Sequence, residues 1–564
     1  MWHNIYNTKP IKEFNMRKRN GACPICYART LVTPKERKIP TLYNQEVFEN
    51  GLAKTPPMGW NSWNVFKENI DETMLYEMAK AMVDNGLLEA GYNFFNLDDC
   101  WEAKERNMRG ELVSDPTTFP SGIKALVEKV NALGLKLGIY SCNGPLTCQH
   151  FPGTQGHEYT DAYTFASWGV EYWKLDYCHN VPFTPYAPLV AGIAVSKVGE
   201  KVEVLHSAEE GTRCGNAHIF TTKYPKKRYN STQRFKKHCS GLDAGEGSIE
   251  WNISVPEEGE YVLTIYTHEL YPKYEKLLGA QINDGELYLV KIPKEVYHWQ
   301  EYITQKVVKL RAGQNKIKLF NPINNKSTSD MLQFQYAGKC IKQATADYAR
   351  ANGVPEKPIV FSICEWGSGE PHLWGRSAGN LWRTTGDIYH NWNSIKNLYE
   401  HNVELYKYAD VGHWNDPDRL EVGVGNFSYN ENEAHFALWC MMASPLLLGN
   451  DLRAMTPDIV KIITNKQLIA IDQDGLGKQA KRIVKADVDV LVKPLVGGKT
   501  AICYFNKTDS AKRYNFDENT FVKEEYIDYN TNGEIIDCLS GNITTKEDML
   551  SGEIKARSVK VFVI

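Results

Sequence analysis

Residues 172–178 read Tyr-Trp-Lys-Leu-Asp-Tyr-Cys, a short apolar run in which a lysine and an aspartate stand two positions apart. If this run is a β-strand, Lys174 and Asp176 point to the same side of it. Residues 163–169 precede it and end in Gly169, the pattern of a helix closed by a C-terminal glycine. A carboxylate that ends an apolar strand after a helix occupies the catalytic position of a barrel enzyme. From this segment alone, an ion pair without a catalytic role is the alternative.

Strands and helices alternate along the first third of the chain. Apolar runs predict strands at 56–64, 93–99, 136–141 and 172–178, and the second of them ends in two acids. Helical spacing of apolar residues covers 71–85 and 123–133, followed by the stop residues Gly86 and Gly134. Such alternation predicts a parallel sheet with crossover helices.

The alternation is interrupted after residue 180. Prolines at 182, 185 and 188 indicate a linker, and from about residue 202 the pattern is that of antiparallel strands, such as 251–256, 260–266 and 316–320. A helix at 341–352 and strands at 359–364, 381–383, 413–414 and 444–448 then resume the first pattern. Eight strands in total predict a (β/α)₈ TIM barrel interrupted after its fourth strand.

Alternating runs at 489–493, 500–505 and 558–563 predict a C-terminal antiparallel β-sandwich. The predicted organisation is therefore an N-terminal extension (1–50), the first half of the barrel (51–185), an inserted β-sandwich (186–338), the second half of the barrel (339–477) and the C-terminal sandwich (478–564).

Composition excludes several classes of protein. The 564 residues are 42% hydrophobic and 24% charged with a formal charge of −3, so nothing indicates nucleic-acid binding, and no apolar run suggests a membrane span. The first 48 residues lack the apolar core of a signal peptide, which predicts a cytoplasmic protein. Thirteen cysteines in so large a chain do not indicate a disulfide scaffold. Cys23 and Cys26 form a lone CxxC, for which an incidental thiol pair is favoured over a zinc site.

Acids gather at the ends of the predicted barrel strands, where Lys174 and Arg383 also lie. The acids are Asp98, Asp99, Asp176, Glu365, Asp387, Asp416 and Asp418. Any one of them is explained equally well as a helix cap, but their repetition at one end of the barrel indicates a reaction site. Motifs for nucleotide phosphates, for closely spaced zinc-binding histidines and for a serine nucleophile are absent, so we expect no metal and no cofactor.

Paired carboxylates with cations and aromatic rings are typical of glycosidases. Such an enzyme needs one ionised carboxylate at the anomeric carbon and one protonated acid at the leaving oxygen. We expect Lys174 to hold the pKa of Asp176 down, and a second, shielded acid on another strand to have a raised pKa.

Six ordered motifs identify a family resemblance. They are residues 57–64 (PMGWNSWN), 97–101 (LDDCW), 174–178 (KLDYC), 364–367 (CEWG), 382–388 (WRTTGDI) and 415–418 (NDPD). Over 55–180 and from 339 to the C-terminus, the chain closely resembles glycoside hydrolase family 27, the α-galactosidases (melibiases) and α-N-acetylgalactosaminidases.

The resemblance implies that Asp176 is the nucleophile and Asp387 the acid/base of a reaction that retains the anomeric configuration. The two carboxyls of such a pair lie about 5–5.5 Å apart. It further implies a sugar pocket with Trp63 as an aromatic wall, Asp98 and Asp99 at O4 and O6, Lys174 at O3 and O4, Arg383 and Asp418 near the 2- and 3-hydroxyls, and Tyr140 and Cys148 as further pocket residues.

The segment Cys364, Glu365 and Trp366 resembles the part of α-galactosidases that contacts the sugar's 2-position. Enzymes for N-acetylgalactosamine usually carry smaller residues there, which favours terminal α-linked galactose in oligosaccharides or glycoconjugates. N-acetylgalactosamine or β-L-arabinopyranose with the same chemistry is the alternative, followed by a sugar-binding protein without catalysis.

The sequence departs from the family pattern at three places. The cysteine that would pair with Cys100 is missing, so Cys100 is expected to be a thiol. Cys148 and Cys178 match a pair that is bridged in secreted relatives, which is doubtful in a reducing compartment. Arg419 stands where relatives commonly have Met, and at the pocket rim it would alter the leaving-group preference or pair with an acid.

The inserted sandwich weakly resembles carbohydrate-binding modules of family 35, through residues 208–211, 259–261 and 310–315. Two interpretations stay open: a second carbohydrate site, or a structural or dimer-forming insert without a sugar site.

Overall fold

The computed structural model describes residues 46–200, 204–221, 235–269, 276–292, 300–516 and 533–564. These form two compact units: unit 1 contains Val47–Asn180 and Ala337–Ile564, and unit 2 contains Val181–Tyr336. Most of the predicted N-terminal extension, including Cys23 and Cys26, lies outside the described residues. Within the described part of the chain, no helix is both long enough and apolar enough to cross a membrane.

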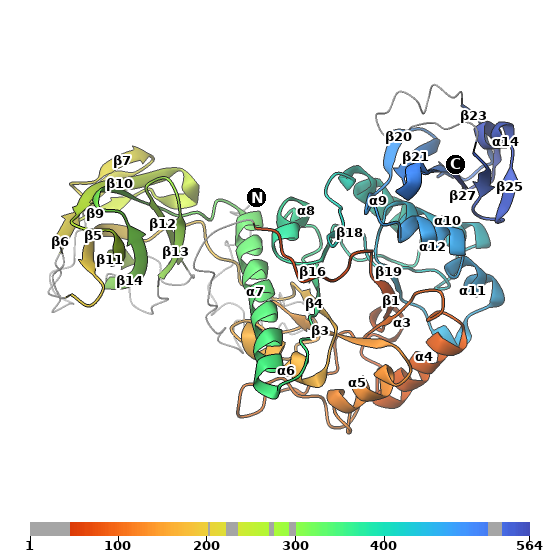
Figure 1. The fold of residues 1–564 in the computed structure, drawn as a ribbon, viewed down its shortest axis with the longest axis horizontal. Helices are drawn as coiled ribbons and strands as arrows, with labels where there is room; N and C mark the ends of the chain where they lie inside the picture. Colours follow the sequence, from red (N-terminus) through yellow and green to blue (C-terminus); the bar gives the residue numbers. More distant parts are fainter. Residues whose placement is uncertain (1–45, 201–203, 222–234, 270–275, 293–299, 517–532) are drawn as a thin grey trace, which may run out of the picture. The chain divides into compact units, whose positions relative to one another are not determined.

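Eight parallel strands form one sheet in unit 1 (Figure 1). In chain order they are β1 (Met58–Asn61), β2 (Phe94–Asn96), β3 (Lys136–Cys142), β4 (Tyr172–Asp176), β16 (Val360–Cys364), β17 (Leu381–Arg383), β18 (Trp414–Asp416) and β19 (Leu446–Leu448). Each strand pairs with the next from β1 to β18, and β19 pairs with β1. A parallel bridge between Leu420 and Leu448 joins the two ends of the sheet. The predicted (β/α)₈ barrel is confirmed.

The connections between the strands carry the helices of the barrel. They are α3 (Trp63–Phe66), α4 (Glu72–Asp84), α5 (Ile123–Asn131), α6 (Glu158–Trp168), α7 (Lys326–Asn352), α8 (Pro371–Trp374), α9 (Trp392–Asn402) and α10 (Tyr429–Met441), with α11 (Pro457–Ile463) and α12 (Lys466–Asp472) after the last strand. Asp71 caps α4 by accepting hydrogen bonds from the N–H groups of Thr73 and Met74 at 2.9 Å. Gly169 ends α6 in the left-handed conformation, as predicted.

Three predicted boundaries differ from the structure. The helix predicted at 341–352 begins at Lys326, because the buried residues Met331, Phe334 and Ile341 continue the helical spacing toward the N-terminus. The seventh strand lies at Trp414–Asp416 instead of 413–414. The region between 180 and 202 contains the strand β5 (Leu189–Lys197), which is buried on both faces and therefore lacks the alternation that reveals a half-exposed strand.

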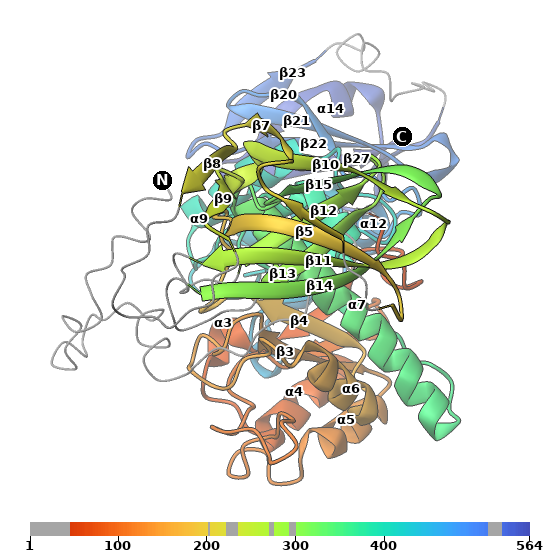
Figure 2. The same ribbon diagram turned by 90° about the vertical axis from the view of Figure 1, so that its left-hand side faces the viewer.

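Unit 2 is a sandwich of two antiparallel sheets. One sheet has the order β13-β12-β15-β10-β7, and the other has the order β14-β11-β5-β9-β8 with β6 also paired to β5. Figure 2 shows β5, β11 and β14 side by side in one layer. Apolar side chains from both sheets, among them Trp251, Leu263 and Ile317, form the core. The remaining bounds are β6 (Val204–Ser207), β7 (Thr212–Gly215), β8 (His218–Thr221), β9 (Lys237–Ser240), β10 (Gly247–Val255), β11 (Gly259–Glu269), β12 (Lys276–Ile282), β13 (Leu287–Ile292), β14 (Gln300–Leu310) and β15 (Gly313–Phe320).

The C-terminal part of unit 1 is also antiparallel. The rings of Tyr504 and Tyr514 stack in its core with centroids 4.4 Å apart. A two-stranded sheet pairs β23 (Lys512–Asn515) with β26 (Ser551–Ile554), which follows α14 (Lys546–Leu550). A six-stranded sheet has the order β20 (Lys481–Val484), β21 (Val488–Pro494), β22 (Thr500–Asn506), β27 (Ser558–Val563), β24 (Ile535–Asp537) and β25 (Asn542–Thr544).

A buried ion-pair cluster joins this C-terminal sheet to the barrel helix α9. Asp489 on β21 is fully buried, and its carboxylate lies 2.9 Å from Arg482 and 3.0 Å from Lys507. The hydroxyl of Tyr399, on α9, donates to the same carboxylate at 2.9 Å. Removal of one partner from such a cluster leaves buried charges without compensation.

We therefore expect Asp489→Ala to lower the free energy of unfolding by about 3–5 kcal/mol. Urea denaturation followed by tryptophan fluorescence measures the change. Asp487→Ala is the matched control, because Asp487 lies beside the same strand with its side chain 67% exposed, and its loss is expected to cost less than about 1 kcal/mol. Equal destabilisation by the two variants would contradict a structural role for the buried cluster.

Candidate active site

The predicted site residues meet at the carboxyl ends of the barrel strands. Asp176 is the last residue of β4, Cys364 of β16 and Arg383 of β17. Asp98 and Asp99 follow β2 closely. All parallel strands of a barrel direct their carboxyl ends to one face, so these side chains converge although they are far apart in sequence.

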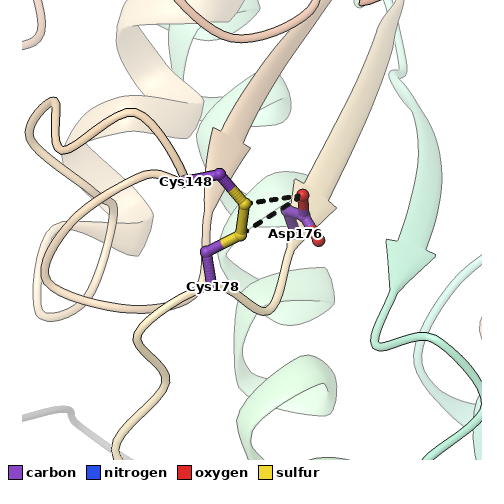
Figure 3. A group of neighbouring side chains, drawn as sticks. All are labelled: Cys148, Asp176 and Cys178. Carbon is purple, nitrogen blue, oxygen red and sulfur yellow. Dashed lines mark hydrogen bonds between the residues drawn. A yellow bond between two sulfur atoms is a disulfide. The ribbon is translucent and has the colours of Figure 1, made fainter. Parts of the chain in front are cut away.

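Asp176 is buried and held at both carboxylate oxygens. Oδ1 accepts a hydrogen bond from the Tyr177 N–H at 2.8 Å, and Oδ2 accepts one from the Tyr140 hydroxyl at 3.1 Å. A disulfide between Cys148 and Cys178 lies beside it, with both sulfur atoms 3.8 Å from Oδ2 (Figure 3). The carboxylate therefore has a fixed position before any substrate arrives, as a nucleophile requires.

The expected effect of Lys174 on Asp176 is only partly correct. Burial raises the pKa of the Asp176 carboxyl, and the nearby Asp387 charge adds to the rise. The Lys174 ammonium and the Tyr177 N–H lower the pKa, but burial outweighs them, so the pKa lies above its usual value. Lys174 makes its close ion pair elsewhere, at 2.9 Å from Asp98 Oδ2.

Asp98 is surrounded by donors. Besides Lys174, its Oδ2 accepts a hydrogen bond from the Asn61 amide at 2.7 Å and lies 3.4 Å from Arg419 Nη1. Burial alone would raise the pKa of Asp98, but Lys174, Arg419 and Asn61 together hold it below its usual value. Asp98 is therefore an ionised acceptor in a buried part of the site.

Asp99 differs sharply from its neighbour. Its carboxylate accepts from the N–H groups of Cys100 and Gln149 at 2.8 and 3.0 Å, and no ion pair with a cation forms there among the described residues. Burial raises the pKa of Asp99 to about 7, with the Asp98 charge adding to the rise against hydrogen bonds from Thr147 and Gln149. The pKa values of these two adjacent acids are thus shifted in opposite directions, because cations lie beside Asp98 but, in the described part of the chain, not beside Asp99.

This difference predicts a pH-dependent stability effect of Asp99→Asn. A carboxyl whose folded pKa exceeds its unfolded value of about 3.9 destabilises the protein progressively as pH rises from about 4 to about 7, by up to about 4 kcal/mol. We expect the melting temperature of the variant, relative to the parent, to rise over that range and to level off at higher pH. The lost hydrogen-bond acceptor shifts the melting temperature of Asp99→Asn equally at every pH. The measured quantity is therefore the slope of the melting-temperature difference against pH.

Asp84→Asn serves as the control for Asp99→Asn, because Asp84 is exposed in the last turn of α4. We expect Asp84→Asn to change stability by no more than about 0.5 kcal/mol at each pH. A melting-temperature difference for Asp99→Asn that stays constant from mildly acidic to mildly alkaline pH would contradict the assigned titration.

Arg383 joins the second half of the site. Its guanidinium lies 3.0 Å from Asp418 Oδ1 and 3.1 Å from Asp387 Oδ1, and it contacts the Cys364 sulfur at 3.7 Å. Asp418 Oδ2 also accepts a hydrogen bond from the Ile388 N–H at 2.8 Å. Arg383 and Asp418 are buried, so they form a rigid base under the loop that carries Asp387.

The expectation that the second acid is shielded with a raised pKa is wrong for the protein without substrate. The Asp387 side chain is 51% exposed. Partial burial raises the pKa of Asp387, but the cations Arg383, Arg419 and Lys174 together lower it by more than burial raises it. The pKa therefore lies below its usual value. The sequence motif located Asp387, but its exposure and its three cations depend on the folded loop.

The segment after β16 uses its glutamate to hold its own loop. Glu365 is buried, and its Oε2 accepts hydrogen bonds from the Gly369 N–H at 2.6 Å and the Ser368 hydroxyl at 2.9 Å. Trp366 is half-buried and meets the Tyr177 ring edge-on, with centroids 6.0 Å apart. The segment therefore adds an aromatic surface next to the residue that follows Asp176.

Asn61, which was not among the predicted site residues, links several of them. Its Oδ1 accepts from the Trp63 N–H at 3.0 Å and from Arg419 Nη1 at 2.7 Å, while its amide donates to Asp98. Trp63 itself begins α3 and is half-buried. A polar residue at the end of the buried strand β1 was the signal that could have identified Asn61.

The structure also describes the three departures from the family pattern. Cys100 is a buried thiol, as expected, and Cys148 and Cys178 are bridged. Arg419 is 6% exposed, so its predicted location at the rim is wrong. Its predicted pairing with an acid is confirmed by its contacts with Asp98 and, at 3.3 Å, with Asp418.

Cys148, Asp176 and Cys178 are also close enough together to resemble a metal-ligand set. Thiolates bind metal ions, however, and the two sulfurs here are joined in a disulfide. This donor set therefore does not fit a metal ion.

Comparisons with known proteins show which family the chain resembles. The family described as "Alpha galactosidase A" matches residues 55–195 and 328–474. α-Galactosidase A of Cellvibrio japonicus (strain Ueda107) is 33% identical over 83% of this chain and 79% of its own, and α-galactosidase 2 of Arabidopsis thaliana is 32% identical over 82% and 78%. The solved structure of α-galactosidase I from Mortierella vinacea aligns with a TM-score of 0.60 and 25% identity over 91% of this chain and 98% of that one. The chain belongs to the α-galactosidase family, glycoside hydrolase family 27.

Proposed function

We propose that the protein is a retaining, exo-acting α-galactosidase that releases terminal α-linked galactose from oligosaccharides or glycoconjugates. The observation that carries the proposal is the placement of Asp176 at the end of β4 and of Asp387 in the loop after β17, where it lies 3.1 Å from Arg383. One carboxyl is fixed and buried, and the other is accessible on a loop. This division suits a nucleophile at the anomeric carbon and a proton donor at the leaving group.

In the first step, an Asp176 oxygen attacks the anomeric carbon while the Asp387 carboxyl donates its proton to the glycosidic oxygen, which departs as an alcohol. In the second step, Asp387 removes a proton from water, whose oxygen displaces Asp176 from the anomeric carbon and frees galactose. Two inversions give net retention of configuration.

The electrostatics of the free protein change during this cycle. A sugar that covers Asp387 removes water from its carboxyl and raises its pKa, which favours the acid form for the first step. Formation of the glycosyl ester removes the negative charge of Asp176, which lowers the pKa of Asp387 again and favours its action as a base in the second step.

The sugar contacts proposed for the other site residues follow the family pattern. They are stacking by Trp63, hydrogen bonds from O4 and O6 to Asp98 and Asp99, a hydrogen bond from Lys174 to O3 and O4, and contacts of Arg383 and Asp418 with the 2- and 3-hydroxyls. Tyr140, Cys148, Cys364, Glu365 and Trp366 complete the proposed wall around Asp176.

A panel of aryl glycosides tests the proposal. We expect turnover of the aryl α-galactoside, with α-galactose as the first product seen by proton NMR. Preferred turnover of the α-N-acetylgalactosaminide or the β-L-arabinopyranoside would instead support the alternative substrates with the same chemistry. Binding of galactose without hydrolysis of any member would support a non-catalytic sugar-binding protein.

A cytoplasmic location is part of the proposal. Buried thiols such as Cys364, Cys440 and Cys503 support it, because oxidising compartments favour paired cysteines, whereas the Cys148–Cys178 disulfide argues against it. Blockage of thiols in freshly lysed cells, followed by mass spectrometry, would reveal whether the Cys148–Cys178 disulfide exists in the cell.

A second carbohydrate site in unit 2 and self-association are proposals of lower rank. Unit 2 has a shallow hollow of about 490 Å³ lined by Glu260, Asn283 and Arg311 among others, but without an aromatic ring. Calorimetric titration of Asp176→Asn with galactosides tests the second site through its stoichiometry, and light scattering tests self-association.

A further inference from the structure

Arg419 is a buried arginine that the family pattern does not predict at the sugar site. It lies three residues beyond the end of β18, next to Asp418. Its Nη1 donates to Asn61 Oδ1 at 2.7 Å and lies 3.4 Å from Asp98 Oδ2, while its Nε lies 3.3 Å from Asp418 Oδ1. One guanidinium therefore contacts groups from the ends of β1, β2 and β18.

Arg419 is also a central member of a chain of charges. Six side chains of alternating sign contact one another in sequence, with separations of 2.9, 3.4, 3.3, 3.0 and 3.1 Å: Lys174, Asp98, Arg419, Asp418, Arg383 and Asp387. The first five are largely buried, and the last is half-exposed. Without Arg419 this row of charges separates into the pair Lys174–Asp98 and the trio Asp418–Arg383–Asp387.

The contacts with Asn61 show how Arg419 acts on Asp98. The Asn61 amide oxygen accepts hydrogen bonds from Arg419 and from the Trp63 N–H, and its nitrogen points toward Asp98 Oδ2, so Arg419 and the Trp63 N–H together orient this donor. Arg419 thus acts on Asp98 Oδ2 in two ways, as a donor itself and as one of the two groups that orient the Asn61 amide. Lys174 is the third donor.

We infer that Arg419 is a positioning residue that fixes the Asp98 carboxylate for recognition of the sugar's C4 hydroxyl and links it electrostatically to the acid/base Asp387. This inference rests on the proposed function, which assigns Asp98 to O4 and Asp387 to proton transfer. A carboxylate held in one orientation discriminates an axial hydroxyl from an equatorial one, because its acceptor lone pairs then have one direction.

The charge of Arg419 also acts on Asp387. The charged and titratable groups that influence Asp387 come from four barrel strands or the loops after them: Arg383, Arg419, Lys174, Asp176 and Cys364. Arg419 is one of the three cations that lower the pKa of Asp387. Its removal should therefore raise the pKa of the acid, so that activity persists to higher pH.

The test compares Arg419→Met, Arg419→Lys and the parent on aryl α-galactoside and on its 4-deoxy analogue. We expect Arg419→Met to lower kcat/KM about tenfold to 100-fold on the galactoside, chiefly through KM, the size expected for a charge-assisted contact. We expect little change on the 4-deoxy analogue, which lacks the hydroxyl that Asp98 binds. In the profile of kcat against pH, the alkaline limb should move to higher pH in Arg419→Met. It should stay in place in Arg419→Lys, which keeps the charge.

Arg350→Met is the control, because Arg350 is an exposed arginine in the last turn of α7 whose ion-pair partner is Asp347, and its loss should leave turnover unchanged. Equal losses by Arg419→Met on both substrates with an unmoved alkaline limb would overturn the inference and indicate a structural role only. If Arg419→Met does not fold, Arg419→Lys decides the question through the same comparison of the two substrates. Absence of turnover by the parent would overturn the proposed function itself, and the inference with it.

Discussion

Asp176→Asn is expected to lower turnover of an aryl α-galactoside by about 10⁴-fold or more while the protein becomes more stable. The loss of activity follows because the amide cannot form the glycosyl ester through which both steps pass. The gain in stability follows from burial, which raises the pKa of Asp176 above its unfolded value. A buried carboxylate of this kind costs stability once pH rises above the unfolded pKa, and the neutral amide removes that cost.

Parallel assays of turnover and of melting temperature at neutral pH provide the measurement for Asp176→Asn. The matched control is Asp472→Asn, because Asp472 is another buried carboxyl whose pKa burial raises, but it lies at the end of α12 outside the site. We expect Asp472→Asn to keep the activity of the parent. Turnover by Asp176→Asn within about tenfold of the parent would contradict the assignment of the nucleophile.

A shorter side chain gives a second test of Asp176. Asp176→Gly leaves space beside the anomeric carbon, and we expect added azide to enter it and attack the sugar in place of the carboxylate. The product should be a β-galactosyl azide, because a single displacement inverts the configuration. An α-configured azide would indicate that a different group still forms a covalent intermediate.

The sequence predicted the barrel strands well because each is a short, largely apolar run, and five of the eight end in a polar or charged residue. Asp176, Arg383 and Cys364 end their strands as predicted, since the last residue of a barrel strand reaches the face where loops gather. The strand β5 was missed because burial on both faces removes the period of two on which the recognition of antiparallel strands depends.

The electrostatics of the site could not be predicted from neighbouring residues in the sequence. Lys174 and Asp176 stand two positions apart, but the lysine pairs with Asp98, which is 76 residues away. Asp98 and Asp99 are adjacent, yet cations lower the pKa of one and burial raises that of the other to about 7. Such differences depend on distances of a few ångströms between strands and on the loss of water, which only the folded chain determines.

Asp387→Ala is expected to lower kcat/KM by an amount that depends on the leaving group of the substrate. Proton donation by a positioned acid contributes about 10²–10⁴-fold, and it matters most when the departing oxygen is basic. We therefore expect kcat/KM for a sugar-linked galactoside such as raffinose to fall by about 10³-fold or more, and kcat/KM for 2,4-dinitrophenyl α-galactoside to stay within about tenfold of the parent. Arg383 should remain in place, because Asp418 still pairs with it at 3.0 Å.

The second step of the reaction separates an acid/base role of Asp387 from a role in sugar binding. Without the base, water attacks the glycosyl ester slowly, so Asp387→Ala should release dinitrophenol in a burst and then accumulate a galactosyl adduct on Asp176, detectable by intact-protein mass spectrometry. Added azide, which needs no base, should restore turnover and give an α-galactosyl azide by two inversions. Asp410→Ala, which removes a carboxylate whose ion-pair partners are the partly exposed Arg376 and Lys478, should show no burst. Equal losses on raffinose and on the dinitrophenyl substrate, with no adduct, would assign Asp387 to sugar binding and leave the proton donor to another group.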